Sequence, residues 1–519
     1  MWTLVQKRRI KQSVERTRAF SPRTSRSIEA DESQKQEPAS ADTGVPPNHH
    51  DTILVECTSS SDPLDPRNWP LARRLTTLCI LSLLVFTQAW AGSSSSLAHD
   101  KAAAQFNVCS VGMDFSTAAY LFGLGSGSLF TGPLSETGGR APVYLVFSFA
   151  FLLFELGAAL SKTFEGVVVC RYFVGLASSG ALGINGASVG DMFNEVERTM
   201  WFPVLAWVNV IPPVIAPIVG GWVVNQPHLD WVWTEWITLI ISAFAFLVAF
   251  LFLPETYLPV LLDWKAKSLR EVSGKDIYAS KHAETSSFFG RLQHNVPLAV
   301  RFATTEPAIL ALGGFLVLLY ILLFSFLSGF DYIFKRTYAL DPLQEGACFA
   351  SILLGATTFT LTTPLFYRQT RRLTDHDLHA PINPEYRLWP AIATAPLLPI
   401  SLFWLGWTNY SHISIYSGLA ACFCFGVVLN AMYVASYQYI IDSYGEHAAI
   451  ALSSITMMRY IIAGGMVMAA RPMYDGIGVH WTMTLLGCVA TLLVPGPYLL
   501  RRWGGKLREK SRSAKGGEA

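Results

Sequence analysis

Residues 132–144 read GPLSETGGRAPVY and connect two apolar runs, each of which is long enough to cross a bilayer. A Gly-Pro pair opens this stretch, and Glu136 and Arg140 follow within a few residues. Opposite charges at a membrane surface can pair with each other or with the ends of neighbouring helices, and such pairs hold one arrangement of helices until they break. The stretch therefore predicts a latch between moving helices, although a simple turn with one topogenic arginine would have a similar sequence.

The composition indicates a membrane protein. Of the 519 residues, 51% are hydrophobic and only 15% are charged, and the mean hydropathy is +0.35. Soluble domains have about one quarter charged residues, so much of this surface is expected to face lipid. The eight cysteines form no CxxC pair and no metal spacing, which favours a packing role. We expect no cofactor and no metal ion.

Apolar runs of about 20 residues recur along the chain and predict an all-α membrane protein with twelve spans in two sets of six. The first bundle covers residues 75–253 and the second 306–500. A polar linker, 254–305, separates them, and a cytosolic tail follows at 501–519. Residues 1–70 have the composition of a disordered cytosolic tail and not that of a signal peptide. The expected spans are 75–95, 115–134, 141–161, 166–190, 200–224, 233–253, 306–330, 345–367, 387–408, 413–440, 447–470 and 480–500.

Lysine and arginine are concentrated in alternate loops, which predicts that both termini are cytosolic. Basic residues flank span one and occur in the linker, in the loop after span eight and in the C-terminal tail. The opposite loops contain few of them. Asn409 begins a glycosylation sequon in a short outer loop, in agreement with this orientation, but the sequon lies close to the membrane.

Span five contains three prolines and a glycine pair, Gly220 and Gly221, within one apolar run. Proline removes backbone donors and bends a helix, whereas glycine lets another backbone come close. Such interruptions are typical of moving or cavity-lining helices, although kinks without a function are an alternative. Spans two and four have small-residue faces, which predict tight helix packing. These faces consist of Gly123, Gly125 and Gly127 in span two, and of Gly175, Ser179, Gly183, Gly186 and Gly190 in span four.

Charged residues inside spans are the most specific indications of functional positions, because a charge in hydrocarbon is costly. Glu155 lies inside span three, Arg171 in span four and Arg459 in span eleven. A carboxyl group removed from water holds a proton more readily, so Glu155 is the candidate proton carrier, with a structural glutamate as the alternative. Arg171 is the candidate coupling cation. Polar and aromatic residues predict an amphipathic substrate cavity: Asn185, Trp207, Asn209, Tyr320, Asn430, Tyr433 and Tyr437.

Seven segments in order give the chain a resemblance to the fungal twelve-span drug:proton antiporters of the major facilitator superfamily. They cover about residues 62–512: DPLDPRNW at 62–69, GPLSETGGRAPVY, RYFVG at 171–175, APIVGG at 216–221, LPETY at 253–257, PEYRL at 384–388 and YIIDSYG at 439–445. Span eleven departs from the common pattern, because Arg471 follows it and would face the outer side.

The resemblance implies export of a hydrophobic or amphipathic compound, such as a drug, toxin or secondary metabolite, by proton antiport at the plasma membrane. It assigns gating to Gly132, Glu136, Gly139 and Arg140, and the antiporter helix to Pro213, Pro217, Gly220 and Gly221. The expected partners are a small-molecule substrate, protons and lipid, without nucleic acid, and the expected unit is a monomer. The alternative is a carrier of an organic acid, a polyamine or a nutrient with the same fold, which could work as an importer.

A membrane-bound enzyme is a third interpretation, which we do not favour. It would need histidines and acids clustered at a bilayer edge, and DHDLH at 375–379 is the one such run in the sequence. A non-transporting sensor is a further interpretation. Such a protein would usually carry a long signalling tail, and the tail expected at 501–519 is short.

Overall fold

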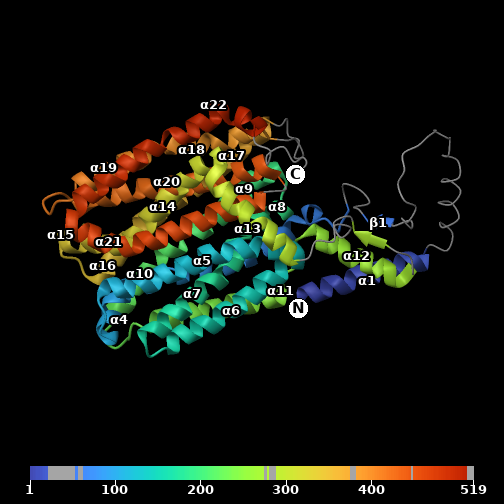
Figure 1. The fold of residues 1–519 in the computed structure, drawn as a ribbon, viewed down its shortest axis with the longest axis horizontal. Coiled ribbons are helices and arrows are strands. Elements are labelled where there is room, and N and C mark those ends of the chain that lie inside the picture. Colours follow the sequence, from blue (N-terminus) through green and yellow to red (C-terminus); the bar gives the residue numbers. More distant parts are fainter. Residues whose placement is uncertain are drawn as a thin grey trace.

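The structure is a computed structural model. It describes residues 1–20, 53–55, 62–273, 277–279, 288–373, 382–445 and 448–510. Within these residues almost all regular structure is helical, and the long helices run side by side along one axis (Figure 1). A bilayer favours this arrangement, because each helix satisfies its own backbone hydrogen bonds.

The first six spans form the N-bundle, and short helices join them: η1 (Pro66–Asn68) before the bundle, and η2 (Ser96–Ala98) and α4 (His99–Phe106) after span one. The spans are α3 (Leu71–Ala91), α5 (Ser110–Gly138), α6 (Arg140–Leu160), α7 with α8 (Phe164–Leu182, Asn185–Met192), α9 with α10 (Glu195–Val210, Pro212–Asn225) and α11 (Trp233–Phe252).

The last six spans form the C-bundle. The helix α21 (Ala448–Leu493) contains two of them, because the backbone is non-helical at Gly478, where φ is 76°. The other elements are α14 (Pro307–Phe330), η4 (Asp331–Lys335), α15 (Arg336–Tyr338), α16 (Pro342–Cys348), α17 (Ala350–Leu373), η5 (Pro384–Leu388), α18 (Trp389–Thr394), α19 (Leu397–Trp407), α20 (Ile415–Tyr444) and α22 (Pro495–Lys510).

The expected twelve spans are confirmed over the described part of the chain. Ten stretches are long and apolar enough to cross a membrane, and one of them, Ala448–Arg508, contains spans eleven and twelve. The glycine-rich α5 supplies the remaining span. The start of α1 and the end of α22 lie at the same end of the bundles (Figure 1), which the distribution of basic residues assigns to the cytosol.

Glycines bring helix backbones into contact inside each bundle. A Cβ atom on Gly123 would lie 2.0 Å from the carbonyl oxygen of Tyr172, and one on Gly175 would lie 1.9 Å from that of Tyr120. The expected packing of spans two and four is therefore confirmed. The same kind of close backbone contact occurs in the C-bundle between α17 and α20, where a Cβ on Gly355 would lie 2.1 Å from the carbonyl oxygen of Phe423.

The start of the chain differs from the expected disordered tail. Residues Trp2–Phe20 form α1, which packs against α12 (Leu258–Ser273) of the linker. Apolar side chains on one face of α1, including Val14, are covered by this contact, and Lys11 pairs with Glu271 at 2.8 Å. The sequence alone did not indicate this, because the helix depends on a surface 250 residues away.

The linker also contains β2 (Ile277–Ala279), which pairs in parallel with β1 (Ile53–Val55), and α13 (Phe288–Thr305), which leads into the C-bundle. Several sequence-based expectations lie outside the described residues. These are most of the N-terminal tail, the end of the C-terminal tail and the histidine-acid run at 375–379.

We predict that Gly175→Ala lowers the stability of the protein by about 1–3 kcal/mol, because the added methyl group must push α5 and α7 apart. Gly465→Ala is the matched control, since a Cβ there has no atom within 4 Å. The measurement is the thermal unfolding midpoint of each purified variant. Equal midpoints for the two variants would contradict the packing argument.

Candidate functional site

The loop at 132–144 is built around the carboxyl group of Glu255, which follows α11. The backbone N–H groups of Arg140 and Ala141 donate to its two oxygens at 2.9 and 3.1 Å. Burial raises the pKa of Glu255, while these donors and the Arg140 guanidinium oppose that effect. Gly139 has a φ of +97°, and a Cβ there would lie 2.5 Å from Glu255 Oε2. Only glycine therefore fits at this turn.

The side chain of Arg140 pairs with a different acid from the one in its own loop. Its Nε lies 3.0 Å from Asp191 Oδ2, and its Nη1 donates to Ser135 Oγ at 2.5 Å. Glu136 acts on Arg140 only through weaker electrostatic attraction. Of the two pairings that the sequence allowed, the structure thus has the one with a neighbouring helix end. Gly132 faces the C-bundle, since a Cβ there would lie 3.2 Å from Ser453 Oγ.

At the cytosolic end, Asp442 of α20 joins the two bundles. It pairs with Arg198 of α9, in the N-bundle, and with Nε of Arg387 of η5 at 2.7 Å. Arg387 also crosses to α9, where its Nη1 donates to Thr199 Oγ1 at 2.5 Å and its Nη2 to the Glu195 carbonyl oxygen at 2.8 Å. We call Asp442, Arg198, Arg387 and Thr199 the cytosolic latch.

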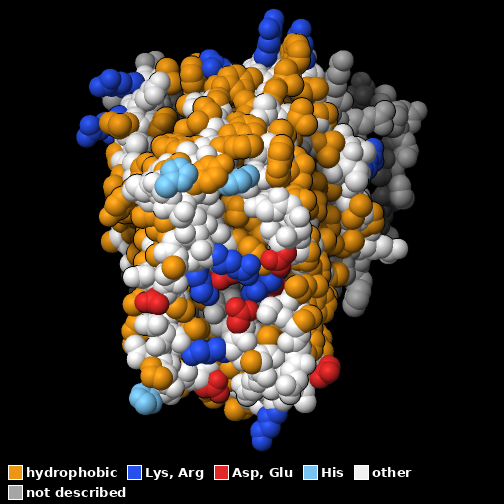
Figure 2. Space-filling model, turned by 90° about the vertical axis from the view of Figure 1, so that its left-hand side faces the viewer, with side chains coloured by type: hydrophobic (Ala, Val, Ile, Leu, Met, Phe, Trp, Pro, Cys, Tyr) orange, Lys and Arg blue, Asp and Glu red, His pale blue; other side chains and the backbone are white. Residues whose placement is uncertain are grey.

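The outer end is closed by a second set of charges. Arg471 of α21 donates through Nε to Asp114 Oδ2 of α5 at 2.7 Å, and its Nη1 lies 3.3 Å from Asp100 Oδ1. Asp114 also lies 2.7 Å from Nδ1 of His99. Figure 2 looks onto this end and shows acidic and basic side chains gathered near its centre. We call Arg471, Asp114, Asp100 and His99 the outer latch.

The interrupted span five forms part of the contact between the bundles. It consists of α9 and α10, which meet at Ile211 just before the proline pair. A Cβ on Gly221 would lie 2.5 Å from the carbonyl oxygen of Pro342, and one on Gly346 would lie 2.9 Å from that of Pro217. The outer half of the helix, which also contains Pro213 and Gly220, therefore lies against or near α16 of the other bundle.

The two intramembrane charges of the N-bundle lie in one buried cluster with Glu235. Arg171 forms an ion pair with Glu235 of α11 and donates to the Ala91 carbonyl oxygen at 2.6 Å. Glu155 interacts electrostatically with both. Neither Glu155 oxygen has a hydrogen-bond partner among the described residues, and its side chain is fully buried. Sequence reasoning placed Glu235 at a helix end and missed this pairing, because only the fold brings spans three, four and six together.

The seven expected cavity residues are buried or half-buried in both bundles, and they form several smaller groups. Asn185 donates to Asn209 at 3.0 Å within the N-bundle. Trp207 crosses to the C-bundle, where its Nε1 donates to Thr357 at 2.9 Å. Asn430 donates to Thr360 at 2.7 Å.

The remaining three expected cavity residues, Tyr320, Tyr433 and Tyr437, lie around Arg459 together with Tyr460. The aromatic residues were expected to line a cavity, but their grouping around one arginine was not foreseen. It joins α14, α20 and α21, which the sequence does not place side by side.

Comparison with known proteins identifies the fold that these contacts build. The family model described as Major Facilitator Superfamily matches residues 78–469. The chain belongs to this superfamily. It is similar to the MFS-type transporter kojT of Aspergillus flavus, with 37% identity over 89% of this chain and 82% of that protein. It is also similar to the citrinin biosynthesis cluster MFS transporter mrr1 of Monascus ruber, with 30% identity over 91% of this chain and 94% of that protein.

A solved structure shows the same fold at low identity. The proton:xylose symporter XylE superposes with a TM-score of 0.59 and 12% identity, covering 84% of this chain and 96% of that one. From the family match and the two relatives, the chain is a multi-pass membrane transporter of the major facilitator superfamily and not an enzyme.

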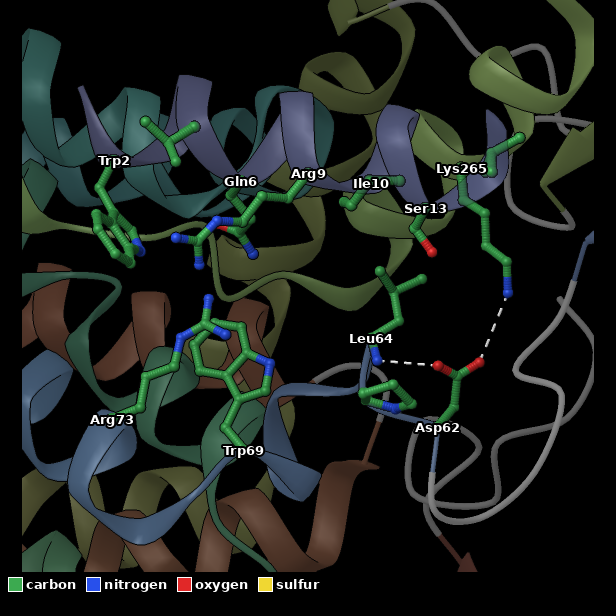
Figure 3. A pocket seen from close by; sticks show the side chains of 13 residues that line it. Trp2, Gln6, Arg9, Ile10, Ser13, Asp62, Leu64, Trp69, Arg73 and Lys265 are labelled. Carbon is green, nitrogen blue, oxygen red and sulfur yellow. Dashed lines mark hydrogen bonds and ion pairs between the residues drawn. The ribbon is translucent and has the colours of Figure 1, made fainter. Parts of the chain in front are cut away.

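Two further features of this transporter lie away from the contact between the bundles. Asn409, in the sequon, donates to Thr337 Oγ1 at 3.3 Å at the outer end. A hollow between α1 and the N-bundle is drawn in Figure 3, where the guanidinium groups of Arg9 and Arg73 approach each other. Arg73 lies over the ring of Trp69, 3.6 Å from its centroid. This hollow exists only because α1 is docked.

We predict that Asp442→Asn opens the cytosolic end of the transporter. Removing the shared carboxylate leaves Arg198 and Arg387 buried side by side, and losing one partner of a buried ion pair costs about 3–5 kcal/mol. The measurement is the labelling rate of a single cysteine, Thr363→Cys, by an impermeant maleimide applied from the cytosolic side in a cysteine-free background. We expect at least fivefold faster labelling.

The matched control for this test is Asp263→Asn. It removes a carboxylate at the same end of the molecule, from an ion pair with Lys267 that lies within α12. Its labelling rate should equal that of the parent. An unchanged rate in Asp442→Asn would show that the latch does not hold the cytosolic end closed.

Proposed function

We propose that this transporter exports a small hydrophobic or amphipathic organic compound across the plasma membrane in exchange for protons, working as a monomer. One observation carries the proposal. The two bundles are joined by buried ion pairs at both ends, through Asp442 and through Arg471, and buried polar and aromatic residues lie between these ends. This arrangement is expected of a carrier in a conformation whose substrate region is closed to both sides of the membrane.

Alternating access follows from the two latches. Opening toward the cytosol requires Asp442 to leave Arg198, and opening toward the outside requires Asp114 to leave Arg471. Each separated charge must be rehydrated as water enters the opened end. A state with both latches broken would lose the stabilisation of both, so the two ends are expected to open in turn.

The gating loop is proposed to control the cytosolic end. Gly139 and Arg140 fix the turn on Glu255, and Arg140 holds Asp191 at the end of span four. Gly132 lies against Ser453 of the other bundle, so a rocking motion changes its surroundings. The carboxylate of Glu136 adds negative charge near the Arg140 guanidinium and attracts it. In the antiporter helix, the residues from Pro213 to Gly221 would let the outer half bend and separate from α16.

Proton coupling is assigned to the cluster of Glu155, Glu235 and Arg171. Two carboxyl groups and one guanidinium leave one negative charge uncompensated in the membrane interior, and adding a single proton removes it. Arg171 already pairs with Glu235, so Glu155 is the group that would take the proton. It belongs to α6, and the cluster touches α3 through Ala91, so a change of charge acts on three or more helices.

The substrate class is supported by the relatives. The name of the Monascus ruber protein places it in a citrinin biosynthesis cluster, which favours export of a secondary metabolite. An importer or a carrier of organic acids with the same fold is the second candidate, because fold does not fix direction or solute. The observation in its favour is the buried Arg459.

The experiment is accumulation of a compound panel in cells that lack or overexpress the protein, with and without a protonophore. The panel contains azoles, polyamines, dicarboxylates and the cell's own metabolites. We expect lower accumulation of at least one apolar compound on overexpression, by about threefold or more, and loss of this effect with the protonophore. Higher accumulation of an acid or a nutrient would replace the exporter by an importer.

We predict that Glu155→Gln abolishes the pH dependence of transport, because glutamine cannot exchange the proton. The measurement is the rate of substrate movement in proteoliposomes over a series of pH values on both sides of neutrality. Glu165→Gln is the matched control, since Glu165 is exposed at the start of α7. A pH profile that Glu155→Gln leaves intact would remove Glu155 as the proton carrier.

A further inference from the structure

Arg459 is a large, deeply buried side chain whose charge the proposed transport cycle does not use. It lies in α21 and is 1% exposed. Its Nε and Nη1 atoms have no hydrogen-bond partner among the described residues. Among the residues that the structure describes, no carboxylate lies within ion-pair distance of the Arg459 guanidinium. Buried charges in native proteins are paired, so the missing partner requires an explanation.

The surroundings of Arg459 hold the cation in place but leave its Nε and Nη1 atoms without an acceptor. The ring centroids of Tyr320, Tyr460, Tyr433 and Tyr437 lie 4.1, 4.7, 5.2 and 5.7 Å from its Cζ atom. Aromatic faces attract a cation, but they do not accept the in-plane N–H groups of a guanidinium as oxygen atoms do. The hydroxyl group of Tyr433 is also buried without a partner.

This tyrosine cage, which we define as Arg459 with Tyr320, Tyr433, Tyr437 and Tyr460, faces the other bundle. The ring of Phe202, from α9, lies 6.1 Å from that of Tyr437. A Cβ on Gly186, from α8, would lie 3.8 Å from the same tyrosine. The N-bundle therefore forms one wall of the cage, and separation of the bundles at either end would uncover it.

We infer that the tyrosine cage binds the anionic oxygen atoms of the transported compound, so that the substrate is an organic acid with a planar apolar body. This inference rests on the proposed function and names its substrate class. One carboxylate oxygen could accept from Nε or from Nη1 of Arg459, and the other could accept from the Tyr433 hydroxyl. The stacked rings of Tyr433 and Tyr437, 4.3 Å apart, would pack against a planar body.

The same geometry disfavours one of the alternative substrate classes. A polyamine is a multiple cation, and it would meet an uncompensated guanidinium at the contact between the bundles. No carboxylate of the described residues forms an ion pair with Arg459, so the repulsion would not be offset there. A neutral apolar compound could contact the rings but would leave the buried donors unpaired.

The test is binding of matched acid and amide pairs to the purified full-length protein, read as the shift of its thermal unfolding midpoint. The probes are benzoate with benzamide, salicylate with salicylamide, and 2-naphthoate with 2-naphthamide, each titrated at neutral pH. We expect at least one acid to stabilise the wild type with at least tenfold higher apparent affinity than its amide. A tenfold difference corresponds to about 1.4 kcal/mol.

Arg459→Gln should abolish this preference for the acid. Arg501→Gln is the matched control, because Arg501 also lies over an aromatic ring, that of Trp389 at 3.8 Å, but is exposed. It should keep the preference. Should Arg459→Gln not fold, Arg459→Lys retains the charge without the planar guanidinium and its Nε donor, and it should reduce the preference by about threefold or more.

The inference is overturned if no acid stabilises the wild type more than its amide, or if the preference survives in the Arg459 variants. The accumulation experiment separates this result from a failure of the proposed function. Proton-driven efflux of a neutral compound that Arg459→Gln leaves unchanged would keep the exporter and remove the organic acid. Absence of any proton-driven efflux would remove the exporter itself.

Discussion

The structure depends on one constraint: a charge taken out of water must find a partner inside the protein. At the cytosolic end, an arginine of the N-bundle meets an aspartate of the C-bundle, as Arg198 meets Asp442. At the outer end the roles are exchanged, since Asp114 belongs to the N-bundle and Arg471 to the C-bundle. The bundles are therefore held together by charges whose separation must be compensated by water, which is available only at an end that opens.

Rocking requires that each bundle move as a unit, and the glycine contacts provide the rigidity. Gly175 and Gly355 bring neighbouring backbones so close that no side chain fits between them. Packing of this kind has few alternatives, because a shift in either direction loses contact or creates overlap. Between the bundles, polar side chains such as Trp207 also make single hydrogen bonds that can be exchanged.

Two groups in the membrane interior stand apart from this rule of pairing. Glu155 lies beside a pair that Arg171 and Glu235 have already formed, and Arg459 is surrounded by tyrosine rings instead of carboxylates. The first needs a proton to be neutral, and the second needs an anion. These are the two components that the transporter is proposed to exchange, and the proposal gives each uncompensated charge a partner that arrives from outside the protein.

The sequence by itself determined the twelve spans, their division into two bundles and the family, because hydrophobic length acts locally along the chain. The sequence also identified Arg140, Glu155, Arg171 and Arg459 as charged residues for which a structural or functional role is expected. Only the tertiary structure decided their partners. Asp191, Glu235 and Asp442 lie near helix ends, where an acid is ordinary in sequence, and the tyrosines around Arg459 come from three helices. Ion pairing depends on distance in space, and helices that cross a bilayer together can be neighbours in many arrangements with the same hydrophobic pattern.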